Sequence, residues 1–199
     1  MQQSKQQRWS TLLQTLQSSN DETEWFEAGT RLSYLKNKRA IKPLIKLMFE
    51  GKHELQREMA GYALAGSHPC GESKHIVTFA FTSVLLNKNE SSRVRGQAAE
   101  GLGCIHGYTD KRNRAFKIAK NALLEALKDE EADVLFWSAY ALGVMNVKEA
   151  VGPLKKLMGD ERHVKSFWTV GQEASDVIHA IETGIWPDRV VPTKNEVGN

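Results

Sequence analysis

The stretch VRGQAAEGLGCI, residues 94–105, places two small side chains, Ala98 and Ala99, three positions before the large aliphatic Leu102. The same arrangement recurs along the chain, with the aliphatic residue at positions 32, 64, 102, 142 and 178. These positions are separated by 32, 38, 40 and 36 residues, which is the period range of stacked helix-pair repeats. We therefore expect an all-α solenoid whose helices approach closely at the small pairs, which are Ala28-Gly29, Ala60-Gly61, Ala98-Ala99, Ser138-Ala139 and Ala174-Ser175.

Each small-pair helix is preceded by another amphipathic segment, and turn-forming residues separate the pairs. A helix pair of this size cannot bury its own apolar stripe, so neighbouring pairs stack and the terminal pairs act as caps, with Trp9 and Trp186 covering the ends of the core. The array should span residues 1–183, and an extended tail should follow at 184–199. The five predicted pairs are 7–16 with 25–35, 39–50 with 54–65, 74–86 with 93–105, 113–127 with 133–145, and 148–158 with 164–181.

The composition indicates a folded, water-soluble chain. Of 199 residues, 41% are hydrophobic and 26% are charged, which excludes a disordered body. No apolar run is long enough to span a bilayer, and the start MQQSKQQRW lacks the apolar core of a signal peptide. Two cysteines do not make a disulfide framework, so we expect reduced thiols and a cytoplasmic protein. The net charge of +3 would steer a polyanion only weakly.

Residues 94–105 also fit a known repeat motif, in which the second helix carries a Val-Arg pair, two small residues, then Leu-Gly and an aliphatic residue. VLFWSAYALGVM, residues 134–145, repeats it with Leu135 in place of the arginine. The motif's first helix begins with Ala, an aliphatic and Pro, as in AIKPLIKLM from Ala40 and AVGPLKKLM from Ala150. In these features residues 25–181 resemble the HEAT-like repeats, particularly the short bacterial variety first described in phycobilin lyases. The resemblance implies the scaffold only, because function depends on the sites that a scaffold carries.

Side chains that the packing does not use are expected to carry the function. In HEAT-like arrays the second helices line a concave face, and curved solenoids bind extended partners there. Residues two positions before each repeat aliphatic should point away from the small-pair contact. FWSAY, residues 136–140, places three aromatics on one turn of such a helix, and aromatics concentrate binding energy at interfaces. The alternative is that Phe136 or Trp137 simply packs against a neighbouring helix.

Carboxylates alternate with the aromatics on this expected surface. They would repel a phosphate backbone and suit a basic partner segment, although charged residues on a helix are most often just solvated. We predict a non-enzymatic protein-binding scaffold, adaptor or immunity-type inhibitor, whose partner-binding residues are Tyr62, Glu100, Asp133, Phe136, Trp137, Tyr140 and Asp176.

Basic residues gather elsewhere, at the turns that lead into first helices. One of these runs, DKRNRAFKIAK from Asp110, has Tyr108 and Phe116 nearby. It supports an alternative function, nucleic-acid binding with or without base excision of the alkylpurine DNA glycosylase type, through Lys111, Arg112, Arg114 and Lys117. A third alternative, implied by the resemblance, is chromophore handling of the phycobilin-lyase type.

Histidines and cysteines lie near the ends of two adjacent second helices, and these are the ligand types that zinc prefers. They lack a paired C-x-x-C spacing, so we expect loop histidines and structural thiols, and we predict neither a metal nor a cofactor. The sequence also lacks G-x-S-x-G, a Gly-rich phosphate loop and H-E-x-x-H, and so gives no catalytic signature. The residues concerned are His68, Cys70, His75, Cys104 and His106.

Overall fold

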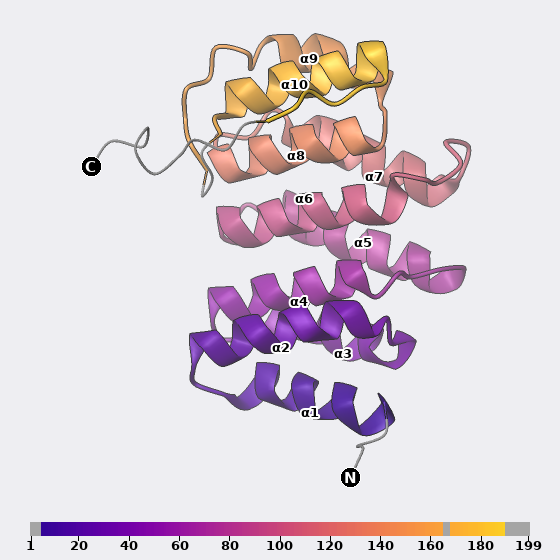
Figure 1. The fold of residues 1–199 in the computed structure, drawn as a ribbon, viewed down its shortest axis with the longest axis vertical. Coiled ribbons are helices and arrows are strands. Elements are labelled where there is room, and N and C mark those ends of the chain that lie inside the picture. The colour runs from indigo at the N-terminus through magenta and orange to yellow at the C-terminus, as the bar shows by residue number, and fades with distance from the viewer. Residues whose placement is uncertain (1–4, 165–167, 190–199) are drawn as a thin grey trace.

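The computed structural model describes residues 5–164 and 168–189, which fold into a stack of helix pairs (Figure 1). Within this part of the chain the only β-type pairing is an isolated bridge between His163 and Thr169, so the predicted all-α solenoid is confirmed. None of the described helices combines the length and apolar character needed to cross a lipid bilayer. The helices are α1 (Lys5–Ser18), α2 (Glu22–Leu35), α3 (Ile41–Glu50), α4 (Glu54–Gly66), α5 (Glu72–Leu86), α6 (Ser92–His106), α7 (Arg114–Ala126), α8 (Ala132–Val144), α9 (Val151–Lys155) and α10 (Val170–Thr183), with 3-10 turns η1 (Lys38–Ala40) and η2 (Lys148–Ala150) before α3 and α9.

The helices form two layers. The second helix of each pair packs against the second helix of the next pair, so that α2, α4, α6, α8 and α10 make one continuous wall, which is nearest the viewer in Figure 1. The first helices α3, α5, α7 and α9 lie behind it. We call the outward surface of α2, α4, α6, α8 and α10 the second-helix face. The apolar core lies between the layers.

The small pairs bring the second helices into close contact, as predicted. All of their residues are buried except Ser175, which is partly buried. A Cβ atom added at Gly29 would lie 2.8 Å from Cβ of Met59 on the next second helix. One added at Gly103 would lie 2.9 Å from Cα of Ala141. The spacing between these helices is therefore set by residues with little or no side chain.

Buried or partly buried ion pairs connect the start of one second helix to the loop before the next. Arg57 in α4 makes two 2.8 Å contacts with the Glu90 carboxylate. Arg95, at the equivalent position in α6, pairs with Asp129, and both side chains are only 3% exposed. The arginine of the repeat motif therefore has a structural role here. Leu135 occupies the same position in α8 and is buried among apolar neighbours instead.

The last pair departs from the predicted boundaries. The predicted helix 148–158 is divided into η2 and the short α9, and α10 begins at Val170 rather than at residue 164. Thr169 explains the later start, because its hydroxyl accepts a hydrogen bond from the Gln172 backbone while the Gln172 side chain accepts one from the Thr169 backbone. This capping box fixes the first turn of the helix. Residues 165–167, also predicted as helix, lie outside the described part.

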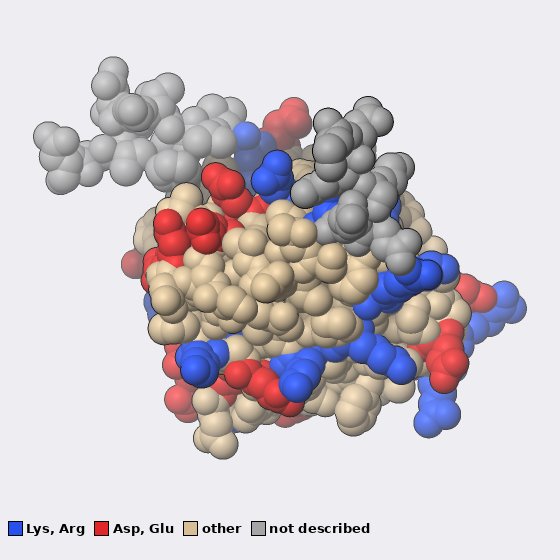
Figure 2. All heavy atoms as spheres, turned by 90° about the horizontal axis from the view of Figure 1, so that it is seen from below, with Lys and Arg blue, Asp and Glu red and all other residues tan. Residues whose placement is uncertain are grey.

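The α1 end of the stack has the character of a cap. Trp9 is partly buried and packs against the core, as expected. The outward positions Ser10, Gln14 and Gln17 are exposed and uncharged. Figure 2, which views the molecule from this end, shows uncharged residues across the middle and charged residues around them. A polar outer surface on a terminal repeat keeps the stack from exposing its apolar core.

Candidate functional site

The second-helix face carries the residues that precede each repeat aliphatic by two positions. All five of these side chains are partly exposed along the wall formed by α2 to α10: Thr30, Tyr62, Glu100, Tyr140 and Asp176. The repeat register therefore places them as the sequence predicts, on positions that the small-pair contacts leave uncovered.

A cavity of about 400 Å³ opens at the centre of this face, which we call the central cavity. Tyr62 of α4 and Glu100 of α6 both line it, and the fully exposed Tyr108 stands in the loop after α6. The remaining lining is mostly small or apolar, so that a carboxylate lies within a largely apolar hollow. Its residues are Ser33, Tyr62, Ala65, Gly66, His68, Gln97, Glu100, Cys104, Gly107, Tyr108 and Val144.

Glu100 is the charged group of the central cavity. Burial raises the pKa of its carboxyl, against the hydrogen bond that Gln97 donates to it at 2.7 Å, and the nearby Glu58 carboxylate raises the pKa further. None of the ion pairs within the described residues involves Glu100. A carboxylate held in this way gains most from a cation that arrives with a ligand.

Other acids on the face already have partners. Glu58 forms an ion pair with Arg93, and the hydroxyl of Ser92 donates to Asp133 at 3.1 Å. A smaller cavity of about 250 Å³ lies between these groups and Trp137. The predicted acidic lining is thus partly neutralised inside the molecule, and Glu100 stands apart from it.

The aromatic cluster on α8 divides into a buried and an accessible part. Phe136 is 3% exposed and packs with Leu135 and Val170, so its predicted role in partner contact is wrong and the packing alternative holds. Its ring supports Trp137, at 5.2 Å between centroids, and Trp137 in turn contacts Tyr140 at 5.8 Å. Trp137 and Tyr140 are partly exposed.

The segment after α10 returns across the second-helix face. In Figure 1 it runs back between α10 and α8. Trp186 packs against Tyr140 with ring centroids 5.8 Å apart, which corrects the expectation that it covers an end of the core. Arg189 then reaches α10, where it pairs at 2.7 Å with both Glu173 and Asp176. Asp176 therefore lies on the predicted face, but its charge is matched by this chain's own arginine.

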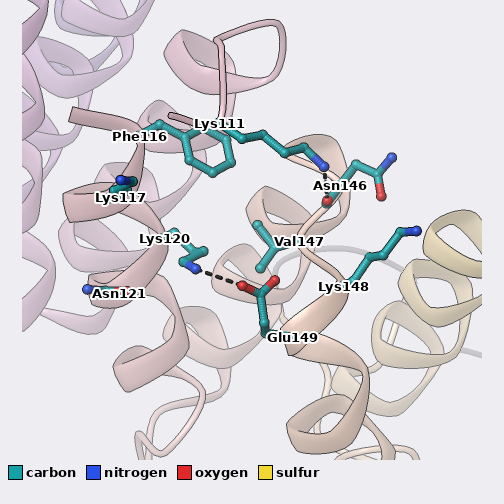
Figure 3. Close-up of a pocket in the computed structure, with 9 residues that line it drawn as sticks. All are labelled: Lys111, Phe116, Lys117, Lys120, Asn121, Asn146, Val147, Lys148 and Glu149. Carbon is teal, nitrogen blue, oxygen red and sulfur yellow. Dashed lines mark hydrogen bonds and ion pairs between the residues drawn. The ribbon is translucent and has the colours of Figure 1, made fainter. Parts of the chain in front are cut away.

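The basic residues of the nucleic-acid alternative lie at the edge of the stack, where a cavity of about 450 Å³ opens between α7 and η2 (Figure 3). Lys111 and Lys117 line it, and the ammonium of Lys111 donates to the Asn146 carbonyl at 2.7 Å. Arg112 is held by Asp110 at 3.0 Å. Arg114, exposed at the start of α7, does not line the cavity, so the four predicted residues do not form one site.

The histidines and cysteines do not gather. His68 and Cys104 line the central cavity, whereas His106 points into the core and contacts Thr78 at 2.9 Å. Cys70 and His75 are exposed. Partial desolvation, together with the Glu100 carboxylate, raises the pKa of Cys104 to about 11, which keeps the thiol protonated. Across the described ranges no group of three or more His, Cys, Asp or Glu side chains is placed to hold a metal ion.

Two functional candidates were missed at the sequence level. The sequence shows Tyr108 only as a neighbour of the basic run, because its place at the central cavity depends on how the loop after α6 turns. Arg189 belongs to a segment with no period, and no sequence signal indicates where such a segment returns to the fold.

The comparisons with known proteins agree with this architecture. Residues 80–166 match the model of the family described as HEAT repeats. The chain is similar to a chain in the structure of the complex of CpcE and CpcF of phycocyanin lyase from Nostoc sp. PCC7120. The two chains are 18% identical, the similarity covers 89% of this chain and 99% of the other, and the TM-score is 0.66. An engineered protein from a structural genomics consortium is similar at 21% identity, with 87% and 78% covered and a TM-score of 0.55. No curated protein matches the sequence. The recurring small-pair helices, the match to HEAT repeats over residues 80–166 and the two-layered stack agree in identifying the fold as a HEAT-like α-solenoid.

Proposed function

We propose that this protein is a non-enzymatic binding module that holds a partner protein on its second-helix face, with the central cavity as the anchor point. The partner contributes a lysine or arginine side chain that reaches Glu100, and its neighbouring residues pack on Tyr62 and Tyr108. The roles that suit such a module are adaptor, regulatory subunit or inhibitor.

The observation that carries the proposal is the state of Glu100. Its carboxylate is partly buried in an apolar hollow without an ion-pair partner among the described residues, and burial raises its pKa. Aromatic side chains at the same cavity supply contact area, and Tyr108 is fully exposed at the rim. A desolvated charge surrounded by aromatic anchors is the usual composition of an interface hot spot. The similar chain comes from a structure of the complex of CpcE and CpcF, which supports a protein partner for this chain.

Site-specific photo-crosslinking in the cells that produce the protein tests this proposal. A photo-reactive amino acid at position 108 should capture one protein in defined stoichiometry. The same group at Phe79, which is 70% exposed on the first-helix layer, serves as the matched control and should not capture it. The crosslink from position 108 should be lost with Glu100→Lys and strongly reduced with Tyr62→Ala.

Equal capture from positions 79 and 108, or capture that survives Glu100→Lys in a chain of unchanged helicity, would exclude the central cavity as the anchor. Circular dichroism of each variant separates loss of binding from loss of fold.

A lyase-like function is the second candidate, since a cavity of about 400 Å³ falls within the range of small-ligand sites and the similar structure is a phycocyanin lyase complex. It predicts a shift of visible absorbance when the protein is mixed with an open-chain tetrapyrrole. The shift should disappear with Glu100→Lys, and an unchanged spectrum would remove this candidate.

A further inference from the structure

The segment after α10 occupies a built site on the second-helix face. Its two anchoring side chains, Trp186 and Arg189, are three residues apart and are separated by Pro187, whose ring restricts the backbone between them. Trp186 meets residues of α8, and Arg189 meets residues of α10. We call residues 184–189 the C-terminal strap, and the surface beneath it the strap site.

The seat for the indole depends on a residue without a side chain. A Cβ atom added at Gly143 would lie 2.8 Å from Cη2 and 3.0 Å from Cζ2 of Trp186, so only glycine lets the ring lie against α8. Tyr140 covers another side of the indole, with centroids 5.8 Å apart. Trp186 nevertheless remains 39% exposed, so it is held at the surface and is not part of the core.

The Arg189 guanidinium is bound by two carboxylates and lies beside an aromatic ring. Arg189 donates from Nη2 to Glu173 and from Nε to Asp176, each at 2.7 Å, and its guanidinium lies 5.2 Å from the ring centroid of Trp168. Planar recognition by two carboxylates and an aromatic ring is specific for arginine. Glu173 is fully buried, and burial raises its pKa although Arg189 opposes this effect. Its Oε1 atom has no hydrogen-bond partner among the described residues, so the site has an acceptor that the strap does not use.

We propose that the strap site is a docking site for a partner segment that carries an aromatic residue followed three positions later by arginine, and that the C-terminal strap is its displaceable internal occupant. The inference rests on the proposed function, because the strap covers the α8 and α10 part of the same face. The strap shows which chemistry the site accepts: an indole against Gly143 and Tyr140, and a guanidinium between Glu173 and Asp176. Partner binding at the central cavity would then be strengthened by a second segment that replaces the strap.

Competition between strap and peptide follows from their attachment. A tethered segment acts at an effective concentration on the order of millimolar, so it excludes a weakly binding free segment of the same sequence. If the strap occupies its site in about 99 of 100 molecules, the apparent affinity for a free segment falls about 100-fold. Loosening the strap should restore that affinity without any change at the strap site.

The test uses the full chain and a fluorescently labelled peptide with the sequence GIWPDR, residues 184–189. In fluorescence anisotropy, the peptide should bind the Trp186→Ala/Arg189→Ala chain at least about tenfold more tightly than the wild-type chain. The peptide GIAPDA should bind neither. Adding Asp176→Asn or Tyr140→Ala to the double variant should weaken the binding of GIWPDR again, whereas adding Phe79→Ala on the other layer should not.

Equal affinity of GIWPDR for the wild-type and strap-loosened chains, or no binding to either, would overturn the inference, provided that circular dichroism shows the variants to be folded. A wild-type dimer that becomes monomeric with Arg189→Ala would also overturn it, because the strap would then belong to a neighbouring copy. The peptide experiment needs no knowledge of the partner. Its failure therefore leaves the crosslinking result at position 108 intact, and failure of that crosslink leaves the peptide result intact.

Discussion

His106 should make the stability of this protein depend on pH within a narrow range. The imidazole is fully buried at the end of α6, where Nε2 contacts the Thr78 hydroxyl at 2.9 Å and the ring meets Phe116 edge to face. Burial lowers the pKa of His106 from 6.5 to about 4, with a further lowering by the charges of Lys74 and His75. The folded state therefore holds the neutral ring, and protonation favours the unfolded state.

The magnitude follows from this difference in pKa. A change of about 2.5 units at about 1.36 kcal/mol per unit corresponds to roughly 3 kcal/mol of unfolding free energy. Because the pKa is lower in the folded state, this contribution is fully present above pH 6.5. It is lost as the pH falls from 6.5 to 4. His106→Gln keeps a side chain able to hydrogen-bond to Thr78 but removes the titration.

Urea unfolding followed by circular dichroism and by tryptophan fluorescence, between pH 7 and pH 4, measures this effect. The unfolding free energy of the wild-type chain minus that of His106→Gln should fall by roughly 3 kcal/mol across the range. The exposed His179→Gln on α10 serves as the control and should run parallel to the wild type. A difference between wild type and His106→Gln that stays constant within about 0.5 kcal/mol would refute the assignment, since carboxylates titrate alike in both chains.

Three further predictions concern the scaffold and the alternative site. Asp129→Asn should lower the unfolding free energy by about 3–5 kcal/mol at pH 7, since Arg95 is left buried without its counter-charge, while the exposed Glu130→Gln should change little. Burial opposes the ionisation of Asp129, but Arg95 and Lys88 lower its pKa to about 2. In urea titrations the difference in unfolding free energy between the wild type and Asp129→Asn should therefore narrow as the pH falls from 3.8 towards 2. Gly103→Ala should lower the thermal midpoint of unfolding, because the added methyl group is overpacked against Ala141 at a cost of about 1–3 kcal/mol, which the better helix propensity of alanine offsets only in part. Gly152→Ala, which has open space around it, should not lower the midpoint. In gel-shift assays we expect no tight binding of duplex DNA to the wild-type chain, because Arg112 is paired with Asp110 and Arg114 does not line the cavity between α7 and η2; binding with a steep salt dependence that is lost in Arg112→Ala/Arg114→Ala would revive the nucleic-acid alternative.

The repeat pattern was sufficient to predict the stack because the second helix of every repeat must pack closely against the next one. Ala98-Ala99 and its equivalents had to be small for the second helices to touch, and this requirement is visible as a spacing in the sequence. The start of α10 was also visible, since Thr169 and Gln172 form a capping-box pair, but the apolar period that continues from Val164 concealed it. The interruption of α9 after Lys155 depends on how the last pair closes against its neighbours, which no local pattern records.

The candidate site was only partly predictable for a related reason. Helical spacing places Phe136 and Tyr140 on the same side of α8, yet the first is buried and the second is partly exposed. Val170 at the start of α10 packs with Phe136, and the strap reaches only as far as Tyr140. Exposure on a shared face thus depends on which neighbouring segment covers each residue, and the helical period of α8 alone does not show this.

The position two before each repeat aliphatic is not used by the small-pair contacts and stays partly exposed, so its residues show what each level of the stack has available for binding. At the C-terminal levels this freedom is already used, because Tyr140 holds Trp186 and Asp176 holds Arg189. At the central levels Tyr62 and Glu100 face an open cavity, and the described strap does not reach them. At the C-terminal end of the face, the chain's own tryptophan and arginine thus contact the aromatic and acidic groups. The chemically similar groups at the centre have no such contact from the strap. The same preference for a cation beside an aromatic ring should therefore govern what binds at the centre, which makes Glu100 and Tyr62 the first residues to change in any search for the partner.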